Sequence, residues 1–486
     1  MKKTALLLIS LLPALLFAQN NNVQRYIDEK LKCDSIMRST ITGIFAVDHN
    51  DNVVAEWNPD FPMLTASTMK TITTGVALEL LGPDFRFETS LAYDGYIRDS
   101  ILFGNLYIVG GGDPTLGSTD TVATHLDTLF STWCNAVKGV GIKKIDGFVV
   151  ADDTFFENEA IPQSWSWGNI GASYGSAPSG LTFFENKQIF MAQPGITEGE
   201  SVNITCEYPS VPGMVYLNSV VTSPRERGNN ISYFVSDLAR IARFEGSLAI
   251  GRNNVRMENS NKFAPLSCAW HFREYLSLNG VGCNENVFTT HDFPNYDKGQ
   301  LVYIISTYSS ELIRIINVTN RISNNLYAET LLKTVGKELT GTGSYNSSYV
   351  AMDSMLIKLG VPKGGFTMSD GSGLSRQNYV SPRFFVNFYK QMEQSEYFDL
   401  YLNSFPIPGK PGTLSTVLRN DPDSLKEKIH AKSGSLASVR CYAGYAEDKE
   451  GLIRFAILVN NYSVRTSEIQ PLIEGFIREL AIYCQK

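Results

Sequence analysis

Apolar positions near the start of the chain predict a strand pair followed by a helix. Residues 43–49 and 53–57 are apolar-rich runs on either side of Asn50-Asp51-Asn52, and such runs around an Asn/Asp turn indicate a β-hairpin. From residue 67 to residue 81 the apolar period becomes helical, and a Gly-Pro pair then provides a stop signal. A short amphipathic helix is predicted ahead of the hairpin, over residues 23–37.

The last third of the chain repeats this mixture. Helical periods cover residues 323–339 and 382–392, strands are predicted over 438–446 and 452–459, and an apolar-striped helix follows at 468–483. Sheet at both ends with helices between them indicates that the two ends of the chain join one α/β domain. We assign the apolar stripe of the last helix to the core rather than to a membrane contact.

The segment between residues 87 and 299 has a different texture. It is rich in Gly, Asn, Ser and Thr, and it carries short alternating runs such as 105–109 and 147–151. Few long helical periods interrupt it. We therefore predict a mostly β insertion within the α/β domain.

The first eighteen residues have the layout of a secretory signal peptide. Two lysines follow Met1, residues 5–17 are largely apolar, and the small residue Ala18 closes the segment. The apolar run is too short to span a bilayer comfortably, and no later stretch is long and uninterrupted enough to do so. We expect a secreted protein without a transmembrane segment; an uncleaved anchor is the alternative.

Composition narrows the class of partner. The 486 residues carry a net charge of −7, which becomes more negative when Lys2 and Lys3 leave with the signal peptide. An acidic exported protein without a basic run is not expected to bind nucleic acid as its main partner. The seven cysteines contain no CxxC pair and the five histidines no HExxH spacing, so no metal site is predicted, and the disulfide pairing stays open.

The chemistry begins with Ser67-Thr-Met-Lys70, the one S-x-x-K in the chain. On a helix, positions i and i+3 share a face, so the Ser67 hydroxyl and the Lys70 amine meet within one turn. A serine hydroxyl is a poor nucleophile unless a base takes its proton, and a desolvated lysine is neutral enough to serve. Taken alone the pattern is weak, because most such pairs lie on solvated helix turns.

Two further motifs change that reading. Ser323-Asn324-Asn325 places a hydroxyl and an amide at the start of a predicted helix, although the S-x-N pattern recurs, for example at 277–279. Lys432-Ser433-Gly434 is the one K-[ST]-G, and it heads a predicted strand, where Gly434 allows close backbone approach. In this order the three motifs form the set of the penicillin-recognising serine enzymes.

With these motifs the chain resembles the class C penicillin-binding proteins, the D-alanyl-D-alanine carboxypeptidase and endopeptidase family. The resemblance extends to residues 81–87, 104–114, 370–376 and 408–414 and covers nearly all of the mature chain. Two positions depart from the family pattern: Ser433, where threonine is commoner, and Ala66, where proline is frequent.

The resemblance implies a fold and its division. We expect an α/β penicillin-binding, transpeptidase-like domain, with an antiparallel sheet flanked by helices and two mostly β inserted domains. The expected boundaries are 1–18 for the signal peptide, 19–89 and 300–486 for the catalytic domain, 90–110 and 179–299 for one inserted domain, and 111–178 for the other.

The resemblance also implies a reaction. A serine DD-peptidase of the periplasm would remove the terminal D-alanine from peptidoglycan stem peptides and cleave D-alanine crosslinks, without a cofactor, and β-lactam antibiotics would acylate it. Ser67 would attack the carbonyl between the two D-alanines and Lys70 would accept its proton. Ser323 and Lys432 would relay that proton to the leaving D-alanine, while Asn325 holds the substrate backbone.

The remaining expected contacts come from the strand motif. The backbone amides of Ser67 and Ser435 would form the oxyanion hole, and Lys432, Ser433 and Ser435 would receive the terminal carboxylate. Asp152, by resemblance, would meet the amine of the substrate's diamino acid; such a residue otherwise caps a turn.

Some readings stay open. The glycine-rich segment 370–373 is either a simple turn or a part of the cleft. The alternative functions are a serine β-lactamase, against which the insertion of more than 200 residues argues, and a non-catalytic peptidoglycan-binding protein, against which the presence of Ser67 and Lys70 argues.

Overall fold

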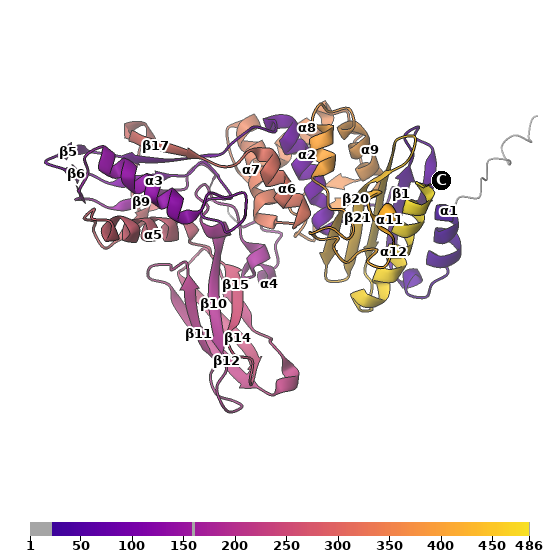
Figure 1. Cartoon of the computed structure of the whole chain (residues 1–486), viewed down its shortest axis with the longest axis horizontal. Helices are drawn as coiled ribbons and strands as arrows, with labels where there is room; N and C mark the ends of the chain where they lie inside the picture. The colour runs from indigo at the N-terminus through magenta and orange to yellow at the C-terminus, as the bar shows by residue number, and fades with distance from the viewer. Residues whose placement is uncertain (1–21, 158–160, 486) are drawn as a thin grey trace, which may run out of the picture.

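The computed structural model describes residues 22–157 and 161–485. In Figure 1 the first and last parts of the chain share one body at the right, a second body extends to the left, and a β-rich arm points down between them. The predicted signal peptide, residues 1–18, lies outside the described residues.

The body that holds both ends is built on a five-stranded antiparallel sheet, in the order β2-β1-β22-β21-β20. Its strands are β1 (Ile41–Val47), β2 (Val53–Trp57), β20 (Ile429–Leu436), β21 (Val439–Glu447) and β22 (Leu452–Asn460). The predicted hairpin and the two predicted strands near the C-terminus are confirmed. Because β1 pairs with β22, the two ends of the chain meet in one sheet, as expected.

Successive residues of this sheet enter two different cores, because side chains alternate between the faces of a strand. Ala456 and Leu458 of β22 belong to one core, and Phe455 and Ile457 belong to the other. Helices cover both faces, which confirms the expected sheet flanked by helices. The first core packs α2 (Met69–Leu81), α6 (Leu312–Arg321), α7 (Asn325–Thr340), α8 (Tyr345–Lys358) and α9 (Pro382–Met392), and the second packs α1 (Asn22–Tyr26) and α12 (Thr466–Tyr483).

One predicted helix is wrong in its length. The sequence predicts a helix over residues 23–37, whereas α1 ends at Tyr26 and a π-helical turn, Ile27–Leu31, follows it. Val23, Ile27 and Leu31 recur every four residues, which is wider than the 3.6 residues of an α-helical turn. The wider turn keeps all three side chains fully buried.

The second body contains a five-stranded sheet with the order β16-β9-β7-β4-β17. Its strands are β4 (Glu88–Tyr93), β7 (Leu106–Val109), β9 (Val149–Asp152), β16 (Val287–Thr289) and β17 (Val302–Tyr308). Two helices that the sequence analysis missed, α3 (Leu126–Gly139) and α5 (Ala264–Leu278), pack in its core. They contain Thr, Ser, Trp, His and Phe, which are weak helix formers, so tertiary packing decides their structure.

The arm consists of two three-stranded sheets, β11-β10-β15 and β12-β14-β13. The strands are β10 (Lys187–Gln193), β11 (Asn203–Tyr208), β12 (Val215–Ser223), β13 (Ser232–Val235), β14 (Ile241–Ala249) and β15 (Val255–Ser260). They enclose a core of their own around Phe190, Phe244 and Leu248. The remaining short elements are β3 (Met63–Leu64), β5 (Tyr96–Arg98), β6 (Ile101–Phe103), β8 (Lys144–Ile145), β18 (Phe366–Thr367), β19 (Tyr379–Val380), α4 (Trp167–Ile170), α10 (Phe398–Asn403) and α11 (Asp423–Lys426).

Strand pairing divides the insertion differently from the expected boundaries. The second body takes its strands from residues 88–152 and 287–308, and the arm takes all of its strands from residues 187–260. We therefore propose that the arm, rather than residues 111–178, is the nested unit, and that the insertion extends to β17. The pairing of β4 with β17 joins residues more than 200 positions apart and leaves no trace in local periodicity. The expected boundaries came from the family resemblance, and no periodic pattern could adjust them.

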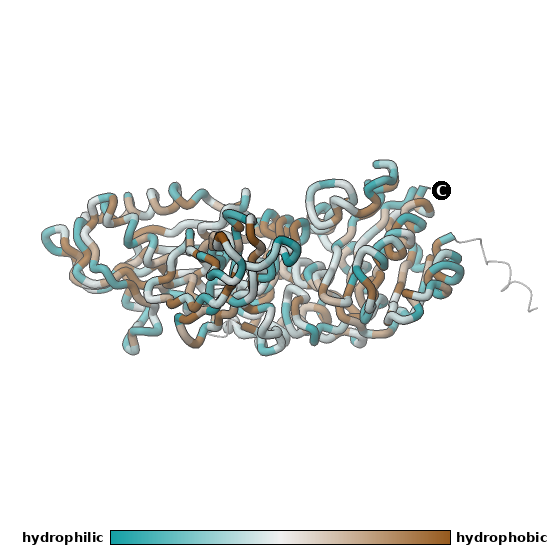
Figure 2. The backbone as a smooth tube through the Cα atoms, turned by 90° about the horizontal axis from the view of Figure 1, so that it is seen from below, coloured by the Kyte–Doolittle hydropathy of each residue, from teal (hydrophilic) through white to brown (hydrophobic). Residues whose placement is uncertain are grey.

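Hydrophobic and hydrophilic stretches are interleaved along the backbone in Figure 2. Among the described residues, no helix combines the length and the apolar character that crossing a membrane requires. The seven cysteines all lie in the described part of the chain and are free.

Candidate active site

Ser67 and Lys70 meet at the start of a buried helix. Residues Ala66–Thr68 form a single 3₁₀ turn that runs into α2, which begins at Met69. Lys70 Nζ lies 3.0 Å from Ser67 Oγ, within hydrogen-bonding distance. Lys70 is fully buried, whereas Ser67 is partly exposed. The predicted pair is therefore formed, with the hydroxyl toward solvent and the amine behind it.

The surroundings of Lys70 weaken its hold on a proton. Burial lowers its pKa to about 7, although the carboxylates of Asp370 and Glu329 oppose that shift. Its Nζ also donates to Asn325 Oδ1, at 2.6 Å, and to the Ser372 carbonyl, at 2.7 Å. A lysine with such a pKa is neutral in a substantial fraction of molecules at neutral pH, which is the state that a general base needs.

The second motif lies at the start of α7. Asn325 accepts the hydrogen bond from Lys70 and donates through Nδ2 to the Tyr174 carbonyl, at 2.8 Å. Ser323 has a positive φ of 64°, and the side chain of Asn324 caps the helix by accepting from Tyr327 N. Ser323, Asn325 and Tyr174 line one hollow of about 440 Å³. The structure therefore brings Asn325 to Lys70 and places Ser323 in the hollow that Asn325 also lines.

The third motif lies on β20. Lys432 is buried, and its Nζ donates to the Ser433 carbonyl, at 2.7 Å. Burial, together with the positive charges of Lys70 and Arg440, lowers the pKa of Lys432 well below its usual value. Ser433 is largely buried, and Ser435, two residues on, is exposed. Gly434, two residues after Lys432, lies against the turn that carries Ser67, which places the strand motif beside the first motif.

Gly434 lets this strand approach the nucleophile. A Cβ at Gly434 would lie 2.6 Å from the Thr65 carbonyl oxygen and 3.0 Å from Ser67 N. Backbone atoms cannot retreat from such a clash as a flexible side chain can. The close approach predicted for this glycine is confirmed, and it brings β20 alongside the amide of Ser67.

Residues 370–373 form a part of the site, which decides between the two readings of this segment. The Ser372 carbonyl accepts from Lys70, and Gly373, with φ of +81°, leaves no room for a Cβ because one would lie 1.8 Å from the Ala66 carbonyl oxygen. The sequence analysis missed two residues that support the site. Glu329 accepts hydrogen bonds from the amides of this segment, and the Tyr174 carbonyl accepts one from Asn325. Their contacts use main-chain atoms, which no sequence motif records.

Asp152 takes the alternative role of holding a turn. It is 1% exposed, and its carboxylate accepts from Thr154 N, from Thr154 Oγ1 and from the Tyr296 hydroxyl. All of these contacts lie in the second body. The expected contact between Asp152 and a substrate amine therefore finds no support in the geometry.

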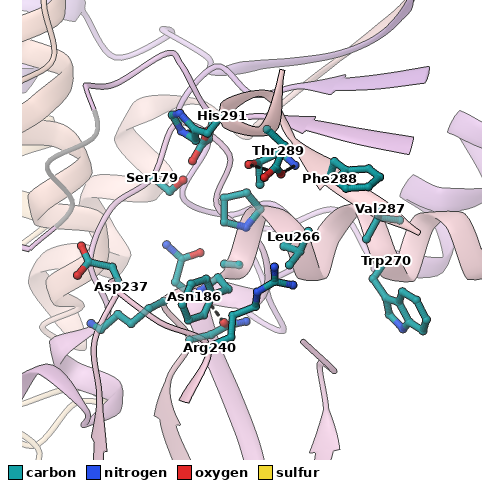
Figure 3. A pocket seen from close by; sticks show the side chains of 18 of the residues that line it. Ser179, Asn186, Asp237, Arg240, Leu266, Trp270, Val287, Phe288, Thr289 and His291 are labelled. Carbon is teal, nitrogen blue, oxygen red and sulfur yellow. Dashed lines mark hydrogen bonds and ion pairs between the residues drawn. The ribbon is translucent and has the colours of Figure 1, made fainter. Parts of the chain in front are cut away.

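A cavity of about 730 Å³ lies elsewhere and includes none of the motif residues. In Figure 3 its lining comes from the start of α5, from β16 and from the base of the arm, where Arg240 and Asp237 are labelled. Asp153 and His291 form an ion pair at its edge, 3.0 Å apart, and the carboxylate raises the pKa of His291. Within residues 22–157 and 161–485, no group of three or more His, Cys, Asp or Glu side chains is placed to hold a metal ion.

Comparison with known proteins gives a consistent result over the whole chain. The sequence matches the D-Ala-D-Ala carboxypeptidase 3 (S13) family over residues 23–479. It is 27% identical over 447 residues to a D-alanyl-D-alanine carboxypeptidase of Actinomadura sp. (strain R39), covering 88% of this chain and 79% of that protein. It is 28% identical over 446 residues to the D-alanyl-D-alanine carboxypeptidase DacB of Haemophilus influenzae, covering 89% and 88%.

A solved structure shares the fold. The crystal structure of penicillin binding protein 4 (dacB) from Haemophilus influenzae superposes with a TM-score of 0.81 and 26% identity, covering 96% of this chain and 99% of that one. A second structure of that protein, complexed with a novel β-lactam, has a TM-score of 0.77 and 24% identity. The similarity includes the inserted bodies, because nearly the full length of both chains is covered.

Proposed function

The chain belongs to the D-Ala-D-Ala carboxypeptidase 3 (S13) family, and from this premise we propose that it removes the terminal D-alanine of peptidoglycan stem peptides through an acyl-enzyme on Ser67. As a member of this family it is a serine-type peptidase, and D-Ala-D-Ala carboxypeptidase activity follows from the family and from both curated relatives.

One observation carries the mechanism: Lys70 Nζ lies 3.0 Å from Ser67 Oγ while being fully buried. A neutral Lys70 takes the hydroxyl proton as Ser67 attacks the carbonyl between the two D-alanines. Ammonium Lys70 then has two further acceptors, Asn325 Oδ1 and the Ser372 carbonyl, which stabilise it until the proton moves on.

The leaving D-alanine needs that proton. In the proposed mechanism Ser323 and Lys432 relay this proton. Ser323 lines the hollow beside Asn325, and the positive charge of Lys70 helps to lower the pKa of Lys432. The backbone amides of Ser67 and Ser435 stabilise the oxyanion. Lys432, Ser433 and Ser435 receive the terminal carboxylate of the substrate. Water then hydrolyses the acyl-enzyme.

We also propose that the enzyme cleaves crosslinked peptides, that penicillins inhibit it and that it is exported to the periplasm. Endopeptidase cleavage of D-alanine crosslinks uses the same attack on a D-alanyl carbonyl. Penicillins acylate Ser67, and the structure of the Haemophilus influenzae relative with a β-lactam supports this partner. Export to the periplasm rests on the leader-like residues 1–18 and on the cell-wall activity of the relatives.

Release of free D-alanine from a diacetylated tripeptide ending in D-Ala-D-Ala tests the proposal, with Ser67→Ala as the matched control. We expect release of D-alanine by the wild type and none above background by the variant. We also expect the wild type to cleave a crosslinked muropeptide dimer, which mass analysis of the products measures. Equal release by both proteins would remove Ser67 from the reaction. A folded wild type that leaves both substrates intact would support a non-catalytic binding protein instead.

A further inference from the structure

A buried carboxylate lies behind Lys70 that the reaction scheme above does not use. Glu329 is fully buried on α7, four residues after Asn325. Residues four apart on a helix lie on the same face. One face of α7 therefore presents an amide that contacts Lys70 and, one turn later, a carboxylate.

Glu329 holds the backbone that faces Lys70. Its two oxygens accept from Gly371 N, at 3.0 Å, and from Ser372 N, at 2.7 Å. The carbonyl of the same Ser372 accepts from Lys70 Nζ, at 2.7 Å. A continuous chain of contacts thus runs from Glu329 through the 371–372 backbone to the amine that activates Ser67.

The neighbouring carboxylate, Asp370, has a different task. It accepts from Gly373 N, Ser375 N and Asn378 Nδ2, which close its own turn, and from Trp165 Nε1 at 2.8 Å. These contacts are typical of an aspartate that shapes a turn. Glu329 instead joins the turn to the helix that carries Asn325.

We propose that Glu329 is a positioning residue of the acylation step, which fixes the Ser372 carbonyl against the amine of Lys70. This role rests on the proposed function, and it concerns how readily Lys70 gives up and regains its proton. Glu329 touches neither substrate nor the reacting hydroxyl.

The charges around both groups determine the sign of the effect. Lys70 is faced by Ser67 from the turn that precedes α2, and by Asn325 and Glu329 from α7. Asp370 faces it from the 370–373 turn, Lys432 faces it from β20, and Arg440 lies on the neighbouring strand β21. The two carboxylates raise the pKa of Lys70 while burial lowers it.

Glu329 itself is faced by Asp370 and by Tyr345 of α8. Burial and Asp370 raise its pKa, whereas its two amide donors favour the ionised form. When Glu329 is ionised, its charge raises the pKa of Lys70. Removing that charge therefore lowers the pKa of Lys70, because an ammonium beside one carboxylate fewer releases its proton more easily.

Glu329→Gln tests this role, with Glu338→Gln as the matched control, since Glu338 lies on the same helix and is exposed. The measurement is the second-order rate of acylation by a fluorescent penicillin between pH 5 and pH 9, with a thermal melt to confirm folding. In the wild type we expect the rate to rise with pH around the pKa of Lys70, about 7. In Glu329→Gln we expect the rise at lower pH and a plateau lower by about tenfold, which corresponds to about 1.4 kcal/mol in barrier; Glu338→Gln should match the wild type.

A second variant, Glu329→Asp, separates the effect of the carboxylate charge from the effect of its position. It also tests the role if Glu329→Gln does not fold. Glu329→Asp keeps the charge but withdraws the carboxylate from the two amides, so we expect a lower plateau with the rise at the wild-type pH. A folded Glu329→Gln with the plateau and pH profile of the wild type would overturn the role, as would a folded Glu329→Asp with the wild-type plateau. A wild type that the penicillin does not label would instead overturn the proposed function.

Discussion

Lys70 shows how an ordinary side chain acquires catalytic character from its surroundings. Burial lowers its pKa to about 7, and three acceptors (Ser67 Oγ, Asn325 Oδ1 and the Ser372 carbonyl) fix the position of its amine. The same lysine on a solvated helix turn would stay protonated at neutral pH. Its surroundings, rather than the S-x-x-K spacing alone, suit Lys70 to the general-base role that we propose for it.

Lys70→Arg separates a general base from a fixed positive charge. Guanidinium keeps the charge but does not deprotonate in proteins, so we expect acylation by a fluorescent penicillin to fall about 10²–10⁴-fold, the usual cost of losing a general base. A thermal melt checks that the variant folds. A folded variant within about tenfold of the wild type would assign proton abstraction elsewhere, with Lys432 acting through Ser323 as the next candidate.

At the scale of residues, the sequence predicted the side chains to which we assign the reaction but not the groups that hold them. Ser67, Lys70, Asn325 and Lys432 come together from three distant motifs, as expected. Glu329 acts through the main chain of Ser372, and Tyr174 acts through its own carbonyl. Contacts with main-chain atoms do not require a particular residue type, so no sequence motif reveals them. Asp152 was expected at the substrate, but its buried carboxylate holds a turn near Tyr296.

At the scale of elements, the contact between β20 and the Ala66–Thr68 turn decides whether the site forms. Gly434 permits that contact, since a Cβ there would lie 2.6 Å from the Thr65 carbonyl oxygen. Sequence periodicity predicted β21, β22 and the helices α2, α7, α9 and α12, because alternating and 3.6-residue patterns follow burial directly. The K-S-G motif was expected at the head of a strand, whereas Lys432 lies within β20. Periodicity failed for α3 and α5, whose weak helix formers are stabilised by the sheet they pack on.

Gly434→Ala should displace β20 from the nucleophile. Overpacking of this kind costs about 1–3 kcal/mol in the free energy of unfolding, and we expect acylation to slow by at least about tenfold. Gly139→Ala is the matched control, because Gly139 lies at the exposed end of α3 with nothing within 4 Å of an added Cβ. Chemical denaturation and penicillin acylation measure the two effects; a Gly434→Ala protein that acylates like the Gly139→Ala control would contradict the role of close strand approach.

At the scale of the whole molecule, the arm is a unit with its own core and closely spaced ends. Phe190, Phe244 and Leu248 belong to a cluster formed within the arm. Lys187 and Ser260 are partners across antiparallel strands, and Asn261 N donates to the Asn186 carbonyl at 2.7 Å. The arm therefore leaves and rejoins the rest of the chain at one point, where its first residue, Lys187, lines the same hollow as Ser323 and Asn325.

Excising residues 188–259 and joining Lys187 to Ser260 through an Asn-Gly turn should leave the active site in place. Two-residue turns of this kind connect neighbouring antiparallel strands. We expect penicillin acylation within about tenfold of the full chain, together with a lower Tm, because Tyr208 of the arm packs against Phe183 and Phe184. Loss of labelling in a folded excision variant would show that the arm takes part in forming the site.

The location of the covalent bond tests the whole proposal most directly. A labelled penicillin is incubated with the full chain, the protein is digested, and mass spectrometry identifies the modified residue. We predict a stable adduct on Ser67, because the β-lactam resembles the D-Ala-D-Ala end and its tethered leaving group keeps water from the acyl bond. An adduct on another residue, or none on correctly folded protein, would contradict the assignment of Ser67 as the nucleophile, and release of the label within seconds would favour a β-lactamase.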